Sequence, residues 1–272
     1  MKHLILGSKG QIGFHLVSYL QSIGEDIIEF DIVNNTNQDL RIYNNSLLEN
    51  KIKECDFIHF LAFDIGGSIY MEKYQDTFNF IDNNIKIMDR TFNLIKKHKK
   101  PFIFASSQMS NMSYSTYGIL KSIGEKYTKS LNGLIVKFWN VYGYETDEEK
   151  SHVITDFIKM AKKGEIKMKT TGNEVRQFLY GDDCSECLFK LSERYDSIDR
   201  NKELHITSFK WTSINHIANI IQEELECTII PGEKEDKVQR GKRNEPNTYI
   251  LNYWEPKTSL KEGIIKIINL LN

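Results

Sequence analysis

Short apolar runs alternate with longer amphipathic segments along the first half of the chain. Each apolar run has the length of a buried strand, and the apolar residues of the longer segments recur with helical spacing. The predicted strands span residues 3–6, 26–31, 56–61, 102–105 and 134–139. Strands that alternate with helices in this way form a parallel sheet with helices on both faces, so the pattern predicts an α/β fold.

The helices between the predicted strands should end near residue 24 and span about 76–98 and 115–132. Beyond Gly143 the pattern changes to an acidic polar stretch, a predicted helix over 151–163 and mixed short elements. This change indicates a large first domain followed by a smaller lobe built mostly from the C-terminal third.

The composition is that of an ordinary globular protein. Of the 272 residues, 40% are hydrophobic and 27% are charged, which allows a normal core and excludes disorder. The 36 basic and 37 acidic residues give a net charge of −1, so we expect no nucleic-acid partner and no anionic membrane partner. No apolar stretch reaches the roughly 18 residues of a bilayer span, and the first strand leaves no room for a signal peptide. We therefore expect a cytoplasmic protein.

The four cysteines are too few for a disulfide scaffold. Cys184 and Cys187 have the spacing of half a zinc or redox site, but the second pair that such a site needs is missing from the sequence. A helix with buried thiols explains the pair better, and no metal site is expected.

A glycine-rich turn follows the first predicted strand and opens the first helix. It contains, in order, Gly7, Gly10, Gln11, Ile12 and Gly13. Glycines permit a tight turn and let backbone N–H groups approach a pyrophosphate at the positive end of a helix. These five residues are therefore candidates for binding a dinucleotide cofactor.

Asp31 ends the second predicted strand, 18 residues after the last glycine of the turn. A carboxylate at this place can accept hydrogen bonds from the adenine ribose hydroxyls and would repel the 2′-phosphate of NADP. The sequence therefore favours NAD. Lys9 argues mildly for the opposite, because a basic residue in the turn can meet a phosphate.

Two further segments have either a structural or a cofactor-binding interpretation. Asp39 and Leu40 lie in a loop after the second strand, and Leu61, Ala62 and Phe63 follow the third. They are either an ordinary loop and strand end, or they place Asp39 and Leu40 beside the adenine and Ala62 under the cofactor. Position along the chain alone does not separate these alternatives.

Tyr117 and Lys121 form the strongest candidate for catalysis. Residues four apart share a helix face, so the lysine ammonium can lie near the tyrosine phenol and lower its pKa from about 10. The phenolate would then serve as a base near neutral pH. Ser106 and Ser107 follow a predicted strand shortly before this helix, and a hydroxyl there can hydrogen-bond the same reacting oxygen.

These features together resemble the extended short-chain dehydrogenase/reductase family, specifically its nucleotide-sugar epimerases and dehydratases. The matching segments are 7–13, Asp31, Ser106-Ser107, Tyr117–Lys121, 140–143, 176–183 and 254–263. The resemblance covers nearly the whole chain. It implies a Rossmann-type doubly wound parallel sheet, NAD as cofactor, a Ser–Tyr–Lys triad and hydride transfer at a sugar carbon, usually C4.

The resemblance also assigns roles to individual residues. Ser107 matches the catalytic serine, with Ser106 as the alternative, and Asn140 and Arg176 match positions that bind the substrate diphosphate. It further implies a homodimer formed through the two long helices near 76–98 and 115–131.

Gly66 and Gly67 lie in a segment that resembles GDP-mannose 3,5-epimerase and GDP-fucose synthase, in which such glycines admit the sugar close to the backbone. A second segment, with Arg240 and Arg243, resembles an arginine-rich stretch of the same epimerase that meets phosphate. Paired arginine donors suit a diphosphate, although an exposed basic loop is an equally good interpretation. The resemblance favours a GDP-linked, manno-configured sugar.

Departures from those relatives narrow the expected chemistry. The epimerases have a cysteine shortly after the catalytic serine, where this chain offers Met109, and dehydratases have an Asp-Glu pair in this region. Neither Gln108 nor Met109 can act as those acid/base groups. We therefore predict oxidation of the C4 hydroxyl of a GDP-linked manno-type hexose or heptose, in the context of surface-polysaccharide synthesis.

Two alternatives remain open. The protein could be a nucleotide-sugar 4-epimerase, or a 3,5-epimerase, that oxidises the sugar transiently with bound NAD, or it could be a non-catalytic NAD-binding regulator. For the domains, we predict an NAD-binding Rossmann domain over 1–145 with a returning segment at about 175–207. The substrate-binding lobe should comprise 146–174 and 208–272.

Overall fold

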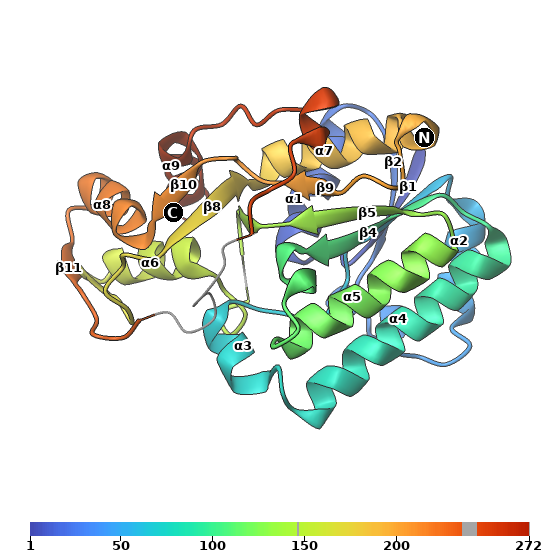
Figure 1. The fold of residues 1–272 in the computed structure, drawn as a ribbon, viewed down its shortest axis with the longest axis horizontal. Coiled ribbons are helices and arrows are strands. Elements are labelled where there is room, and N and C mark those ends of the chain that lie inside the picture. Colours follow the sequence, from blue (N-terminus) through green and yellow to red (C-terminus); the bar gives the residue numbers. More distant parts are fainter. Residues whose placement is uncertain (146, 236–243, 272) are drawn as a thin grey trace.

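A computed structural model describes residues 1–145, 147–235 and 244–271 (Figure 1). Its centre is a parallel six-stranded sheet in the order β2-β1-β3-β4-β5-β9. The strands of this sheet are β1 (Lys2–Leu6), β2 (Asp26–Phe30), β3 (Phe57–Phe60), β4 (Phe102–Ser107), β5 (Leu134–Phe138) and β9 (Leu204–Ile206). The five strands expected from the sequence are confirmed within one or two residues at each end, and β9 adds a sixth.

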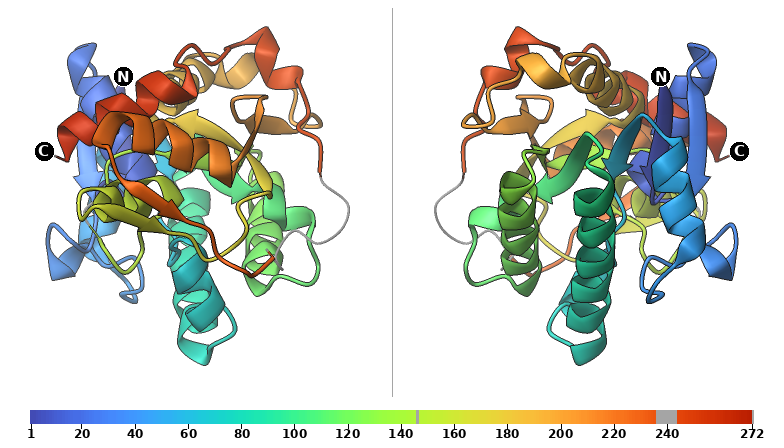
Figure 2. Two further views of the ribbon diagram at one scale, coloured as in Figure 1. Left: turned by 90° about the vertical axis from the view of Figure 1, so that its left-hand side faces the viewer. Right: turned by 90° about the vertical axis from the view of Figure 1, so that its right-hand side faces the viewer.

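Both faces of this sheet are covered by helices. The helices beside it are α1 (Gln11–Ser22), α2 (Ser46–Glu54), α4 (Phe78–His98), α5 (Thr116–Ser130) and α7 (Gly181–Glu193). Ile5 and Ile103 pack in one buried cluster with α1 and α7, whereas Leu4, Leu6 and Phe104 pack in another with α2, α4 and α5. Successive residues of one strand therefore face opposite helix layers, as expected for a doubly wound sheet. Figure 2 shows α4 and α5 side by side on one face.

A smaller group of elements packs around a third apolar cluster. It contains a three-stranded sheet in the order β10-β8-β6 and a two-stranded sheet of β11 and β7. The strands are β6 (Asn140–Tyr142), β7 (Glu165–Lys167), β8 (Val175–Tyr180), β10 (Trp211–Ser213) and β11 (Thr228–Ile230). The helices are α6 (Val153–Ala161), α8 (Ile214–Leu225) and α9 (Leu260–Leu270). Figure 1 shows these elements at the left, beyond the carboxyl ends of the large sheet.

Short helices complete the connections. They are α3 (Ser68–Tyr74) and the 3-10 helices η1 (Thr36–Gln38), η2 (Gln108–Asn111), η3 (Tyr195–Ser197) and η4 (Tyr249–Asn252). The sequence pattern missed α3, because its seven residues are too few for helical periodicity to stand out. None of the helices in the described parts of the chain has the length and apolarity that crossing a bilayer requires.

The parallel arrangement fixes where a site can form. β1, β2, β3 and β4 all end at the same edge of the sheet and lead directly into Gly7, Asp31, Leu61 and Gln108. In open α/β sheets, ligands bind at this carboxyl edge. The residues predicted to act on a cofactor and a substrate are therefore brought to one edge from four separate segments.

Candidate active site

The glycine turn is held tightly against the end of the neighbouring strand. Gly7 has φ +89°, and a Cβ atom there would lie 2.9 Å from the backbone of Ala62. A Cβ on Gly13 would lie 2.0 Å from the Gly7 carbonyl oxygen, so any side chain at that position would force the turn apart. Gly10 is the N-cap of α1 and has no side chain to cover the first N–H groups of the helix. The turn therefore presents an open, positive helix end.

Two polar side-chain atoms in this turn are buried without a partner. Ser8 Oγ and Gln11 Nε2 have no hydrogen-bond partner among the described residues. Buried polar groups in native proteins are normally satisfied, so these atoms suit a polar ligand such as a pyrophosphate. Together with the open start of α1, where Gln11 and Ile12 form the first turn, they fit the dinucleotide that the sequence predicts.

Asp31 lies directly after β2 and braces the glycine turn. Its carboxylate accepts hydrogen bonds from the backbone N–H groups of Lys9 at 2.9 Å and Val33 at 2.9 Å. The Lys9 ammonium is 2.7 Å from a carboxylate oxygen of Glu29. The sequence-based argument for a phosphate contact by Lys9 is therefore weakened, because an acidic side chain already pairs with this ammonium.

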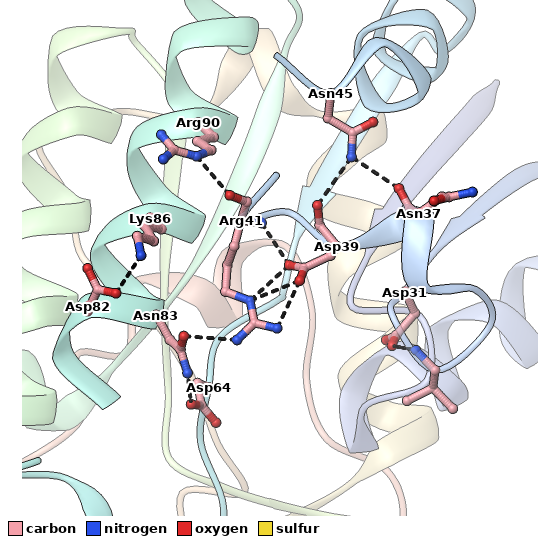
Figure 3. A network of polar contacts seen from close by, with 11 residues as sticks. Asp31, Asn37, Asp39, Arg41, Asn45, Asp64, Asp82, Asn83, Lys86 and Arg90 are labelled. Carbon is pink, nitrogen blue, oxygen red and sulfur yellow. Dashed lines mark hydrogen bonds and ion pairs between the residues drawn. The ribbon is translucent and has the colours of Figure 1, made fainter. Parts of the chain in front are cut away.

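The segment with Asp39 and Leu40 is fixed by side chains rather than by regular structure. Arg41 Nε donates to both oxygens of Asp39, at 2.9 and 3.1 Å, and its Nη2 lies 2.8 Å from Asp39 Oδ2 (Figure 3). Leu40 is 6% exposed and packs in the cluster beside α2 and α4. Burial opposes ionisation of Asp39, but the hydrogen bonds from Arg41 hold its pKa below the usual range.

The residues after β3 link the glycine turn to the tyrosine helix. Ala62 lies against Gly7, and Leu61 packs at the border of the cluster beside α1 and α7. The ring of Phe63 has its centroid 5.8 Å from that of Tyr117 and 3.7 Å from Lys121 Nζ. Phe63 therefore contacts the predicted catalytic pair directly.

The structure brings Ser107, Tyr117 and Lys121 together at the carboxyl edge of the sheet. Ser107 ends β4, and its hydroxyl lies close enough to the Tyr117 phenol to lower the pKa of that group, against the larger effect of burial. Ser107 Oγ also accepts a hydrogen bond of 3.1 Å from the Met109 N–H, which fixes its direction. Tyr117 and Lys121 come from the first two turns of α5, which begins after the side-chain cap Ser115.

The two neighbouring serines face different partners. Ser106 Oγ donates at 2.5 Å to Oε1 of Glu125, which lies eight residues after Tyr117 on α5. The Ser106 hydroxyl thus has a partner in Glu125, whereas the Ser107 hydroxyl interacts with the phenol. The geometry therefore favours Ser107 over Ser106 as the hydroxyl that shares a reacting oxygen with Tyr117.

Lys121 is 3% exposed and donates a hydrogen bond of 2.6 Å to the Ala105 carbonyl. Burial lowers the pKa of this lysine to about 7, and the negative charge of Glu125 opposes that decrease. Its Nζ is 5.7 Å from the centroid of the Tyr117 ring. A weakly basic, enclosed amine therefore lies one helical turn beyond the phenol.

The direction of the Tyr117 pKa differs from the sequence-based expectation. We expected the lysine to lower this pKa, but burial raises it, and the hydrogen bond from Ser107 compensates only in part. The physical reason is desolvation, since a buried phenol loses the water that would stabilise its anion. Spacing along a helix indicated that the two side chains are close but not how far water is excluded from them.

A buried polar network behind the catalytic pair was missed by the sequence analysis. Lys137 is 3% exposed, and its Nζ lies 2.7 Å from Glu203 Oε1 and 3.7 Å from Glu125 Oε1. Glu125 follows Lys121 by four residues, so the same helical spacing that linked Tyr117 to Lys121 could have revealed it. The network fixes Glu125 beside Ser106 and the lysine.

Gly66 and Gly67 form a close contact with a distant segment. A Cβ on Gly67 would lie 2.1 Å from the Ser151 carbonyl oxygen, and one on Gly66 would lie 2.8 Å from Tyr70. The Gly67 N–H also donates to the Lys150 carbonyl at 2.9 Å. Close packing of this segment against residues 150–151 and Tyr70 is therefore a sufficient reason for both glycines, and their contact with a sugar stays a prediction.

The predicted diphosphate-binding residues lie on adjacent strands of the three-stranded sheet. Asn140 begins β6 and donates at 3.3 Å to the Gln177 carbonyl, and Arg176 is in the neighbouring strand β8. Arg240 and Arg243 lie outside the described residues. Asn244, just after them, donates at 3.1 Å to the carbonyl oxygen of Gln108, which brings the C-terminal segment beside Ser107.

His15 is a further residue that the sequence analysis missed. Its Nδ1 lies 2.6 Å from Asp182 Oδ1, and its Nε2 accepts the Tyr144 N–H at 3.0 Å. A Cβ on Gly143 or Gly181 would meet the imidazole ring at 2.2 or 2.5 Å. The histidine therefore joins α1 to two glycine-containing segments, which no local pattern could show.

His152 and Glu145 form an ion pair next to the segment that Gly67 touches. His152 Nδ1 lies 2.5 Å from Glu145 Oε1, and Glu145 Oε2 also accepts from Thr155 Oγ1 at 2.7 Å. Burial opposes the charge on each group, but their hydrogen bond raises the pKa of His152 and lowers that of Glu145. The pair fixes the start of α6.

Known proteins share both the sequence and the fold. A family model described as "NAD dependent epimerase/dehydratase family" matches residues 3–207. A Methanocaldococcus jannaschii protein named "Putative UDP-glucose 4-epimerase" is 29% identical, over 98% of this chain and 97% of that protein.

Two solved structures have a similar fold. A GDP-6-OMe-4-keto-L-xylo-heptose reductase from C. jejuni has a TM-score of 0.84 and 17% identity, over 99% of this chain and 97% of that one. The UDP-glucose 4-epimerase of Thermotoga maritima, solved with UDP-glucose, has a TM-score of 0.77 and 20% identity, over 100% and 98%. At these identities, the likeness shows the fold that the chains share.

Proposed function

The chain belongs to the NAD-dependent epimerase/dehydratase family, and from this premise we propose that it oxidises a hydroxyl of a nucleotide sugar, at C4 of the hexose or heptose. The observation that carries the proposal is the convergence of Ser107, Tyr117 and Lys121 beside the glycine turn. All three are less than 10% exposed, and none of them is needed to fix the turn itself. A phenol, a hydroxyl and an amine in one enclosed place suit proton transfer to and from a sugar oxygen.

Each of the three side chains has a separate task in this proposal. Tyr117 accepts the proton of the sugar hydroxyl on its phenolic oxygen. Ser107 orients the same sugar oxygen, since its hydroxyl lies near the phenol and is fixed by the Met109 N–H. Lys121 in its ammonium form stabilises the phenolate, and its hydrogen bond to the Ala105 carbonyl holds the amine near the phenol.

NAD, when bound, supplies the hydride acceptor and a positive charge on its oxidised ring. The residues that would hold it are Gly7, Gly10 and Gly13 with the first turn of α1, and Asp31 at the ribose. Asp39, Leu40 and Ala62 are proposed to line the adenine end and the neighbouring backbone. Asp31 accepts two backbone N–H groups. In this proposal its carboxylate repels a 2′-phosphate and so favours NAD over NADP.

The substrate is proposed to lie between the two groups of elements, against Gly66, Gly67, Asn140 and Arg176. The glycine segment supports the GDP-linked manno-type sugar that the sequence predicts, whereas the name of the M. jannaschii relative favours a UDP-linked glucose-type sugar. Met109 follows Ser107 at the position where the 3,5-epimerases have a cysteine. This residue supports chemistry at C4 alone, without proton exchange at C3 or C5.

A second candidate is 4-epimerisation, which the M. jannaschii relative favours. It needs the same three residues, because the sugar is oxidised at C4 and then reduced on its opposite face. The two outcomes differ in the cofactor. An epimerase returns NAD unchanged after each turnover, whereas a dehydrogenase accumulates NADH.

We also propose the domain division predicted from the sequence and a homodimer formed through α4 and α5. Exposed apolar side chains on these helices support the dimer, namely Phe78, Ile81, Ile85, Ile119 and Tyr127. Phe78 is 77% exposed, which is unusual for a phenylalanine that faces only water. Sedimentation velocity on the protein and a Phe78→Lys, Ile85→Lys variant tests this assembly.

The function is tested with Tyr117→Phe and a panel of GDP- and UDP-sugars. We expect the variant to bind NAD like the wild type but to lose at least about 10²-fold in turnover, since the phenolic oxygen is the proposed proton acceptor. Tyr114→Phe is the matched control, because Tyr114 lies just before α5 and is 66% exposed.

Product mass and NADH absorbance are followed together for each sugar. Unchanged turnover in Tyr117→Phe would refute the assignment of the base. NAD binding without any cofactor reduction or sugar conversion across the panel would support the non-catalytic regulator instead.

A further inference from the structure

A continuous chain of polar contacts begins at the loop proposed to meet the adenine (Figure 3). Arg41 donates hydrogen bonds to Asp39 from Nε and Nη2, and its third guanidinium nitrogen, Nη1, donates to Asn83 Oδ1 at 2.9 Å. The backbone carbonyl of Arg41 accepts a hydrogen bond of 2.9 Å from Arg90 Nε. The arginine is therefore fixed at its backbone and at its side chain by α4, the helix that carries Asn83 and Arg90.

Asn83 continues the chain to Asp64. Its Nδ2 donates to Asp64 Oδ2 at 3.0 Å, while its Oδ1 receives Arg41. The asparagine amide carries its acceptor and its donor on two separate atoms, which lets Asn83 join a guanidinium to a carboxylate here. The side chain of Asn84, the next residue, fixes the backbone of Asp64. Its Oδ1 accepts the Asp64 N–H at 2.7 Å, and its Nδ2 donates to the Asp64 carbonyl at 3.1 Å.

The Asp64 carboxylate accepts hydrogen bonds from three side chains. Besides Asn83, it accepts from Tyr70 Oη at 2.7 Å and from Lys150 Nζ at 2.9 Å, both at Oδ1. The carboxylate is 17% exposed. Burial opposes its ionisation, but the three hydrogen bonds hold its pKa below the usual range. Asp64 is therefore a firmly ionised anchor rather than a group that titrates near neutral pH.

The far end of the chain lies at the loop proposed to meet the sugar. Asp64 precedes Gly66 by two residues, and Lys150 directly precedes Ser151, whose carbonyl fills the space beside Gly67. The Gly67 N–H also donates a hydrogen bond to the Lys150 carbonyl. The contacts thus begin at one proposed ligand site and end at the other.

We propose that the chain Asp39–Arg41–Asn83–Asp64–Lys150 couples the two sites, so that NAD binding orders the 64–70 and 148–152 segments for the nucleotide sugar. Asp64 and Asn83 are positioning residues in this proposal and touch neither ligand. The proposal rests on the proposed function for the identity of the second ligand. Its first part, ordering by NAD, concerns only this chain and the cofactor.

The physical basis is shared ordering. A ligand that restrains the Asp39 loop also restrains Arg41, and through Asn83 it reduces the conformational freedom left to Asp64. The sugar then binds to a loop whose ordering is already partly complete, which gives positive cooperativity without a change of fold. Coupling of this kind is reciprocal, and about fivefold in affinity is the lower end of its usual range.

Hydrogen–deuterium exchange with NAD alone tests the first part. In the wild type, we expect saturating NAD to slow amide exchange in 64–70 and 148–152. Asn83→Ala should keep NAD affinity within about threefold, because the contacts of Arg41 with Asp39 and of Asp64 with Tyr70 and Lys150 do not involve Asn83. The variant should nevertheless lose this protection in both segments, because the link from Arg41 to Asp64 is broken. Asn93→Ala is the matched control, since Asn93 lies on the same helix and bonds only Asp89 among the described residues.

A second variant separates the last link. Lys150→Ala should lose protection in 148–152 and retain it in 64–70, because it breaks the chain beyond Asp64. Protection that persists in both segments of Asn83→Ala would overturn the proposal, as would its loss in Asn93→Ala.

The second part is measured with UDP-glucose and GDP-mannose as probes, with and without NAD. For the probe that binds, we expect NAD to tighten binding about fivefold in the wild type and to have no effect in Asn83→Ala. Equal coupling in both proteins would overturn the proposal while leaving the proposed function intact. Binding of neither probe, with the exchange protection intact, would count against the proposed function and leave the link between NAD and Asp64 established.

Discussion

Replacing Lys121 with methionine should make the protein more stable near neutral pH while abolishing turnover. Lys121 is 3% exposed, and burial lowers the pKa of its ammonium from an ordinary 10.5 to about 7. Methionine has a similar length and an apolar, flexible side chain, so it can occupy the same space between Phe63 and the end of β4. The variant therefore removes the penalty of enclosing an amine without leaving a cavity.

The size of the effect follows from the two pKa values. Between pH 7 and about 10.5 the unfolded chain binds a proton at Lys121 that the folded chain does not, so this group makes the protein more stable as the pH rises. At 1.36 kcal/mol per pH unit, the penalty in the folded wild type is about 4 kcal/mol at pH 7.5 and about 2 kcal/mol at pH 9. The lost hydrogen bond to Ala105 offsets about 1 kcal/mol of this gain.

Urea unfolding of the cofactor-free protein at pH 7.5, 8.2 and 9 measures the difference. We expect Lys121→Met to exceed the wild type in unfolding free energy at pH 7.5, and the excess to shrink by about 2 kcal/mol at pH 9. Lys126→Met is the matched control, because Lys126 is on the same helix and exposed, and its difference from the wild type should stay constant. A constant difference for Lys121→Met as well would refute the reasoning that burial holds this amine weakly basic.

Two further predictions concern the cofactor and the serines. Asp31→Asn should weaken NAD and raise the NADP-to-NAD affinity ratio roughly tenfold, the size of one hydrogen bond to a charged group, as measured by titration calorimetry; an unchanged ratio would remove Asp31 from the ribose site. Ser107→Ala should lower kcat by about 10²-fold, whereas Ser106→Ala, which loses only a contact with Glu125, should retain most activity. The opposite order in steady-state assays would make Ser106 the catalytic serine.

The local features of the site could be predicted because each rests on a short-range rule. The first strand, the glycine turn and the following helix lie within about twenty residues, and Gly13 is required by a contact with Gly7 only six residues away. Tyr117 and Lys121 share a face because both lie on α5. The placement of Asp31 follows from the parallel pairing of β1 with β2, which puts both strand ends at one edge.

Long-range contacts were not predictable in the same way. The contact of Asn244 with Gln108 joins residues 136 apart, and Lys150 meets Asp64 across 86 residues. Nothing in either neighbourhood indicates the other partner. The segment around Gly66 and Gly67 drew attention to its glycines but not to Asp64, because aspartate is common in turns for purely local reasons.

The alternation of strands and helices, the glycine turn and the closeness of a phenol and an amine were determined by the sequence alone, because periodicity and spacing act over one or two turns of chain. Tertiary structure alone decided which serine faces the phenol, why Gly67 has no side chain, and how burial sets the pKa values of Tyr117 and Lys121. Desolvation depends on every segment that excludes water from a group, and those segments are assembled only when the whole chain folds.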